Sequence, residues 1–123
     1  MSCHTTMSAR HEAHLSPVQC VQSDWTALPD APGQGKSGIL LYAANTLVYG
    51  SGMLACEPVA ASGAAVRVSF RFREFLVMEL MVRSGDSVAF TVVGIDSIRL
   101  ETAAEHTMSG HFSFFPHYSS SQN

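Results

Sequence analysis

The sequence predicts an all-β or β-rich α+β protein, a single small domain built as a barrel or sandwich of about six to eight short antiparallel strands. Three observations support this fold class. Apolar and polar residues alternate strictly in the segment 65–73, AVRVSFRFR, and short apolar runs punctuated by glycine continue from residue 39 to residue 115. The chain has 123 residues, of which 46% are hydrophobic, so it can form one substantial core.

The segment 65–73 predicts a half-buried strand. Its apolar residues alternate with polar ones: Val66, Val68, Phe70 and Phe72 alternate with Arg67, Ser69, Arg71 and Arg73. Because the side chains of a strand point alternately to opposite faces, the valines and phenylalanines should face the core. The three arginines should then project together from the opposite face.

The segment 72–83, which follows, fits two secondary structures. Its apolar run FLVMELMV precedes Ser84-Gly85-Asp86, a combination that favours a strand leading into a hairpin. Its Glu, Leu, Met and Arg residues are also good helix formers. We expect a strand, with a helix as the alternative.

The remaining elements are expected to be short strands of the same kind. In residues 107–115 one face collects Met108, Gly110, Phe112 and Phe114. Earlier in the chain, the apolar runs 38–43, 46–49 and 53–59 are separated by Asn45 and by the sequence Gly50-Ser51-Gly52, which we interpret as a turn.

Composition divides the chain into three parts. Residues 1–35 are polar or rich in proline and glycine, and we expect them to be a flexible leader and loop. Residues 36–116 should form the β-rich domain. Residues 117–123 end in SSSQN and predict a disordered tail.

The cysteines and the N-terminal sequence predict a cytoplasmic protein. Cys3, Cys20 and Cys56 are odd in number and irregularly spaced, unlike a disulfide framework. The first 14 residues, MSCHTTMSARHEAH, lack the basic stretch and apolar core of a signal peptide. A reducing compartment follows from these two observations.

The charge of the chain bears on its partners. A net charge of −3 argues against a nucleic-acid binder, and the apolar runs are far shorter than the roughly 20 residues of a membrane-spanning helix. Only 14% of the residues are charged, so a lone domain would expose large apolar patches. We therefore predict a homodimer that covers them by pairing sheets or edge strands.

No motif supports catalysis or a metal site. Potential metal ligands gather near the N-terminus, at Cys3, His4, His11, Glu12, His14 and Cys20, but their spacing matches no zinc motif. The sequence around Lys36 lacks the first glycine of a phosphate-binding loop, and the residues around Ser51 lack the pattern of a nucleophile elbow. We expect no catalytic residue, no cofactor and no metal, and the sequence leans against an enzyme.

The candidate partner-binding site is the row of Arg67, Arg71 and Arg73. Three guanidinium groups on one rigid face suit a carboxylate or phosphate, and we expect an acidic protein partner. Acidic residues on neighbouring strands, such as Glu79 or Glu101, would neutralise this row instead.

Two functions fit these features. The first is a non-catalytic protein-interaction module, such as a regulator, an adaptor or a neutralising partner. The alternative is a small ligand-binding β-barrel or small enzyme, with an apolar cavity lined by Phe70, Phe72 and Phe90.

Overall fold

Six antiparallel strands make up the described part of the chain. The computed structural model describes residues 20–29, 38–60, 63–102 and 107–118. The strands are β1 (Val21–Ala27), β2 (Ile39–Cys56), β3 (Ala65–Phe72), β4 (Phe75–Arg83), β5 (Ser87–Thr102) and β6 (Met108–Tyr118). They form one sheet in the order β1-β6-β2-β5-β3-β4. The prediction of a small all-β domain is confirmed.

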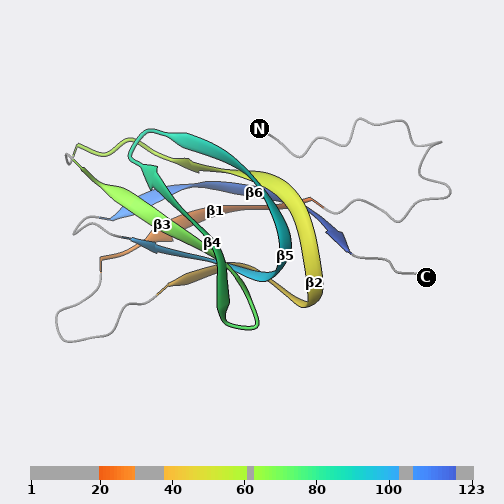
Figure 1. Ribbon diagram of the computed structural model, residues 1–123. Helices are drawn as coiled ribbons and strands as arrows, with labels where there is room; N and C mark the ends of the chain where they lie inside the picture. Colours follow the sequence, from red (N-terminus) through yellow and green to blue (C-terminus); the bar gives the residue numbers. More distant parts are fainter. Residues whose placement is uncertain (1–19, 30–37, 61–62, 103–106, 119–123) are drawn as a thin grey trace, which may run out of the picture.

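Two long strands fold this sheet into a sandwich-like structure. β2 has 18 residues and β5 has 16, and both bend at the same end of the molecule (Figure 1). Their pairing is irregular between Ala43 and Gly50. In the facing part of β5, Gly94 has a φ of 77°, a left-handed conformation that glycine adopts without steric cost.

The bend separates two layers. One layer contains β1, β6, residues 48–56 of β2 and residues 87–95 of β5. The other contains residues 39–43 of β2, residues 97–102 of β5, β3 and β4.

The core lies between the layers and is rich in aromatic rings. Phe70 of β3 packs against Phe90 of β5 with ring centroids 4.9 Å apart. Tyr42 of β2 meets Phe114 of β6 edge-on at 5.0 Å. The predicted alternation is confirmed in β3 and β6, because the apolar residues of one face are buried in each: Val66, Val68, Phe70, Met108, Phe112 and Phe114.

The predicted turn at residues 50–52 is wrong, because β2 runs through it without interruption. Gly50 and Gly52 instead allow the backbone of β6 to lie close to that of β2. A Cβ atom on Gly50 would lie 2.1 Å from the carbonyl oxygen of Phe115, and one on Gly52 would lie 2.2 Å from that of Ser113. The three short strands predicted before residue 60 are therefore one long strand.

The segment 72–83 is a strand rather than a helix, but it does not form the predicted hairpin with the strand that follows. β4 lies at the edge of the sheet and pairs with β3, whereas β5 lies between β2 and β3. The turn at residues 84–86, closed by a 2.9 Å bond from the Asp86 N–H to the Arg83 carbonyl, carries the chain from one layer to the other.

The predicted leader contains a strand that the sequence analysis missed. β1 pairs with β6 along its whole length and buries Trp25, which is 3% exposed. Its alternation covers only seven residues, with polar Gln22, Asp24 and Thr26 exposed, and this signal is weak beside that of β3. Among the described residues we find no helix with the length and apolarity that a membrane crossing needs.

Candidate functional site

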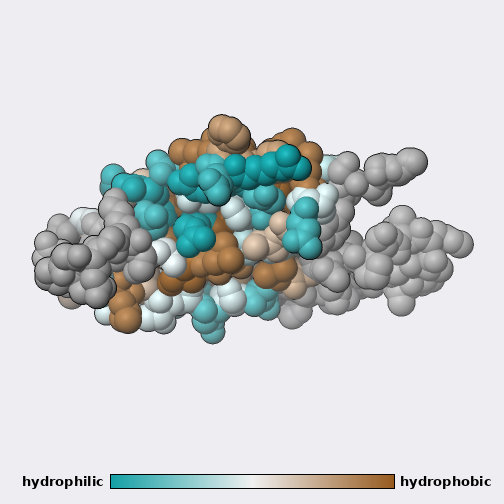
Figure 2. Space-filling model, turned by 90° about the horizontal axis from the view of Figure 1, so that it is seen from below, coloured by the Kyte–Doolittle hydropathy of each residue, from teal (hydrophilic) through white to brown (hydrophobic). Residues whose placement is uncertain are grey.

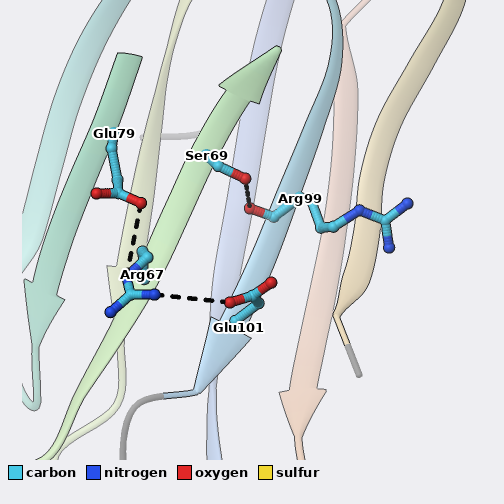
Figure 3. A network of polar contacts seen from close by, with 5 residues as sticks. All are labelled: Arg67, Ser69, Glu79, Arg99 and Glu101. Carbon is cyan, nitrogen blue, oxygen red and sulfur yellow. Dashed lines mark hydrogen bonds and ion pairs between the residues drawn. The ribbon is translucent and has the colours of Figure 1, made fainter. Parts of the chain in front are cut away.

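The outer face of β3 carries the first predicted site residue, Arg67. Its Nε lies 3.6 Å from Oε2 of Glu79 on β4, and its Nη1 lies 3.8 Å from Oε1 of Glu101 on β5 (Figure 3). Glu101 stands directly opposite Arg67 in the β3–β5 ladder. Glu79 stands diagonally from Arg67 in the β3–β4 ladder, opposite Ser69. Neutralisation by neighbouring acidic residues, the alternative that the sequence left open for this row, is therefore present at Arg67.

The three arginines do not form one row. Arg71 shares the outer face with Arg67, but Arg73 lies beyond the end of β3, in the turn to β4. Its guanidinium stacks over the Phe72 ring, 5.2 Å from the centroid. The expectation that all three project from the strand is wrong for Arg73, because the strand ends at Phe72.

The β3–β4 turn is held in an uncommon conformation. Arg73 and Glu74 have φ values of 49° and 74°, a region that residues with a Cβ seldom occupy. The Arg73 N–H donates to the Asp96 carboxylate at 3.1 and 3.3 Å, and Arg71 Nη1 donates to the Glu74 carbonyl at 3.1 Å. These contacts fix the turn as it projects from the body of the sandwich (Figure 1).

Besides Arg83 of β4, this layer contains Arg99 of β5, which the sequence analysis did not single out. It stands opposite Ser69, whose hydroxyl lies 3.5 Å from the Arg99 carbonyl. Its guanidinium extends over β2 and away from Arg67 (Figure 3). The structure thus separates the arginines of this face rather than gathering them around one anion.

A run of exposed apolar side chains follows the free edge of the second layer. We call Phe75, Leu76, Val77 and Met81 the apolar edge; all four lie on β4, and they are 75%, 51%, 45% and 52% exposed. The view from the side of the β3–β4 turn shows apolar and hydrophilic surface interleaved (Figure 2). The signal in the sequence was the unbroken run FLV, which leaves apolar groups on both faces of an edge strand.

A hollow of about 820 Å³ lies beside the end of this edge. It is lined by Val59, Ala60, Gly63, Ala64, Ala65, Met81, Arg83 and Ser84. Arg83 is the charged residue of this lining. The hollow is open to solvent and bounded largely by small side chains, so it can receive a side chain from outside.

Of the three residues of the predicted ligand cavity, the structure brings two together, and these two fill the core rather than line a hollow between them. Phe70 and Phe90 are buried and pack directly on each other, whereas Phe72 lies at the end of β3 beneath Arg73. A second hollow, of about 320 Å³, touches Phe90 and is otherwise lined by Ser51, Gly52, Ala89, Thr91 and Phe115. Ligand binding by this protein stays a prediction.

The described residues show no group of three or more His, Cys, Asp or Glu side chains placed to hold a metal ion. Most of the predicted ligand cluster, from Cys3 to His14, lies outside the described residues. Asp24 and His111 form a pair across β1 and β6, with Oδ1 and Nδ1 2.8 Å apart.

The two described cysteines differ in state. Cys20 is disulfide-bonded, and Cys56 is a free thiol at the end of β2 that is 4% exposed. Burial raises the pKa of the Cys56 thiol above its ordinary value of 9.0, and the carboxylates of Glu57 and Asp86 add to this shift.

Three comparisons with known proteins place these features in context. A family model of endospore appendages matches residues 17–120. A solved structure of Bacillus endospore appendages, described as a novel family of disulfide-linked pili, shares 23% identity with a TM-score of 0.63, covering 86% of this chain and 93% of that one. That likeness shows the same fold. The comparison with curated proteins finds no match.

A structure of infectious bursal disease virus, Gx strain, is more distant. It shares 14% identity with a TM-score of 0.44, covering 85% of this chain and 33% of that one.

The family match contradicts the predicted cytoplasmic location. An appendage of a spore projects from the spore surface, outside the reducing compartment inferred from the cysteines. The prediction failed because three cysteines cannot all be paired within one chain, but two of them can still form a disulfide. Cys20 is disulfide-bonded.

Proposed function

Since the chain belongs to the endospore appendage family, we propose that it is a structural subunit that assembles with further copies of itself into an appendage. One observation carries this proposal: the family match spans residues 17–120, which include all six strands of the described domain. The function is then assigned to the folded domain itself and not to a short motif within it.

The surface of the domain supports self-association. A strand at the edge of a sheet exposes unpaired backbone groups, and proteins that remain monomeric shield such edges. Here the edge strand β4 has nine residues and exposes four large apolar side chains. Burial of such a strand against another subunit removes this apolar surface from water.

The proposed subunit has a non-catalytic role in protein association, which agrees with the general part of the function predicted from the sequence. The finer part, a regulator, adaptor or neutralising partner, has less support than a subunit that binds its own copies. An acidic partner at the arginine row also has less support, because Arg67 already faces Glu79 and Glu101.

The test is whether the purified chain assembles. We expect negative-stain electron microscopy of the concentrated protein under oxidising conditions to show fibres, and light scattering to show a mass that grows with protein concentration. A dilute sample of the same preparation serves as the control. A monodisperse monomer at every concentration and redox condition would contradict the proposal.

A further inference from the structure

We propose that the outer face of the layer formed by β6, β2 and β5 binds a neutral sugar ring, in the hollow of about 320 Å³ beside Phe115. The inference goes beyond the proposed structural role, because it assigns a ligand site to the surface of one subunit and needs no second copy. The chemical class of the ligand is a pyranose whose hydroxyl groups are all equatorial, such as β-linked glucose.

Strand pairing brings the side chains of this hollow together. Ser51 of β2 stands opposite Thr91 of β5 on one side and opposite Phe115 of β6 on the other. Directly opposite residues project from the same face of a sheet, so these three side chains form one row across three strands. Ala89 lies two positions from Thr91 and therefore on the same face, where its short side chain leaves the hollow open.

Phe115 supplies an aromatic surface that the core does not use. The alternation of β6 buries Phe112 and Phe114 between the layers and turns Phe115 to the opposite face. In the part of the chain that the structure describes, Phe115 is partly exposed and is not a member of the core cluster. The face of an aromatic ring carries partial negative charge, so it packs well against the polarised C–H groups of a sugar.

The remaining lining suits a ligand that has many hydroxyl groups and no charge. Ser51 and Thr91 are exposed, and each hydroxyl offers one donor and two acceptor lone pairs. None of the residues that line the hollow is charged. In β-linked glucose the hydroxyl groups lie around the edge of the ring, and both faces consist of C–H groups. One face can therefore lie on Phe115 while the edge of the ring meets the two hydroxyls.

A second aromatic side chain extends the site along β2. Tyr49 precedes Ser51 by two positions, so it lies on the same face, and it is 40% exposed. Two residues of a strand span roughly 7 Å, a length comparable with that of one sugar unit. A chain of β-linked glucose that lies along β2 can contact Phe115 with one ring and Tyr49 with another. An oligosaccharide should therefore bind more tightly than a single ring.

The larger hollow beside β4 does not offer the same chemistry. Its lining is bounded by small and aliphatic side chains and includes the charged Arg83, and no aromatic ring is among the described residues that line it. The smaller hollow, although near the lower limit of about 300 Å³ for small-molecule sites, combines an aromatic surface with convergent hydroxyl groups.

The test is saturation-transfer difference NMR on the full chain with cellotetraose as the probe. The method detects weak ligands on monomers and on large assemblies alike. We expect transfer that saturates with a dissociation constant on the order of 1 mM and is strongest at the axial protons of one ring face. Glucose should bind more weakly than cellotetraose. Cyclohexanol, an apolar ring with a single hydroxyl, and a glucose phosphate, which is charged, should bind no more tightly than glucose.

Three variants locate the site. Phe115→Ala should weaken the binding of cellotetraose about tenfold, and Phe115→Leu should also weaken it, because leucine keeps apolar bulk but has no ring. Thr91→Val removes a hydroxyl at nearly constant shape and should weaken binding as well. The control is Phe75→Ala, which removes a more exposed aromatic ring outside the hollow and should leave binding unchanged. Thermal unfolding shows that each variant is folded.

Each of three results would overturn the inference. The first is absence of transfer to cellotetraose. The second is equal affinity for cyclohexanol, because apolar surface alone would then explain the binding. The third is binding that Phe115→Leu and Thr91→Val leave unchanged, because the sugar would then lie elsewhere. Light scattering on the same samples keeps the two proposals apart: assembly without sugar binding overturns this inference alone, and sugar binding without assembly overturns the structural role alone.

Discussion

Phe70 shows how a single residue stabilises this sandwich. Its ring is fully buried between the layers and lies 4.9 Å from Phe90, so truncation removes contacts to both layers. We predict that Phe70→Ala lowers the free energy of unfolding by about 3–5 kcal/mol. Urea unfolding followed by tryptophan fluorescence measures this loss, since Trp25 is the chain's one tryptophan and is buried.

The matched control is Phe75→Ala. Phe75 is 75% exposed on the apolar edge, and its truncation in a dilute monomeric sample should change the free energy of unfolding by no more than about 0.5 kcal/mol. Equal losses in the two variants would mean that the core does not lie between the layers as described.

Cys56 gives a second prediction for a single residue. Its thiol is buried and its pKa is raised, so the reactive thiolate is scarce at pH 8. We expect native protein to leave Cys56 unmodified by iodoacetamide and unfolded protein to react readily. Because the unfolded chain ionises first, the free energy of unfolding should also fall as the pH rises above 9.0. Fast labelling of Cys56 in the native protein would show that the C-terminal end of β2 is not buried as described.

Among the elements, the β3–β4 turn offers a test of backbone strain. Glu74 has a φ of 74°, where glycine has no steric penalty. We predict that Glu74→Gly raises the free energy of unfolding by about 1 kcal/mol, because Arg71 contacts the Glu74 carbonyl and not its side chain.

Gly85→Ala, in the turn at residues 84–86, is the reverse substitution and serves as the comparison for Glu74→Gly. Gly85 has a φ of 84°, and an added Cβ would meet nothing closer than 3.7 Å. Gly85→Ala should therefore cost about 1–2 kcal/mol for conformational reasons alone. Thermal unfolding of both variants checks the pair, and a stabilising Gly85→Ala would contradict the assigned backbone conformation.

The elements also show why sequence patterns succeeded or failed. The alternation in 65–73 predicted β3 and its inner face, because each apolar side chain there meets the core. The same logic misplaced a turn at residues 50–52, because Gly50 and Gly52 leave room for the β6 backbone rather than for a reversal of the chain. Local composition does not distinguish these two uses of glycine.

The arginine row illustrates the same limit for the candidate site. The faces of Arg67 and Arg71 followed from the strand period, and Glu79 and Glu101 were named as neighbours that would neutralise the row. The position of Arg73 depended on where β3 ends, and that end is set by the turn and its bond to Asp96, a residue 23 positions away. Contacts of that range leave no trace in a local pattern.

At the scale of the whole molecule, the order of the strands was beyond the sequence. β1 pairs with β6 from the other end of the chain, and β4 reaches the edge because the chain crosses between layers after Arg83. The exposed apolar edge on β4 follows from that order. The prediction that copies associate came from composition alone, and composition does not name the surface.

The last prediction concerns covalent links between copies, and it rests on the proposed structural role. A disulfide requires Cα atoms within about 7 Å, which the buried Cys56 of one copy cannot achieve with a cysteine of another. The chain has three cysteines, so at most Cys3 and Cys20 remain as linking points, and exchange can convert a bond within one chain into a bond between two.

We expect a ladder of covalent species on a non-reducing gel of assembled protein, and we expect reductant to collapse this ladder to monomer. Cys56→Ser should leave the ladder unchanged. Cys20→Ser leaves one linking point in each chain, so its covalent species should stop at the dimer, and a ladder that extends further in this variant would show that Cys56 takes part.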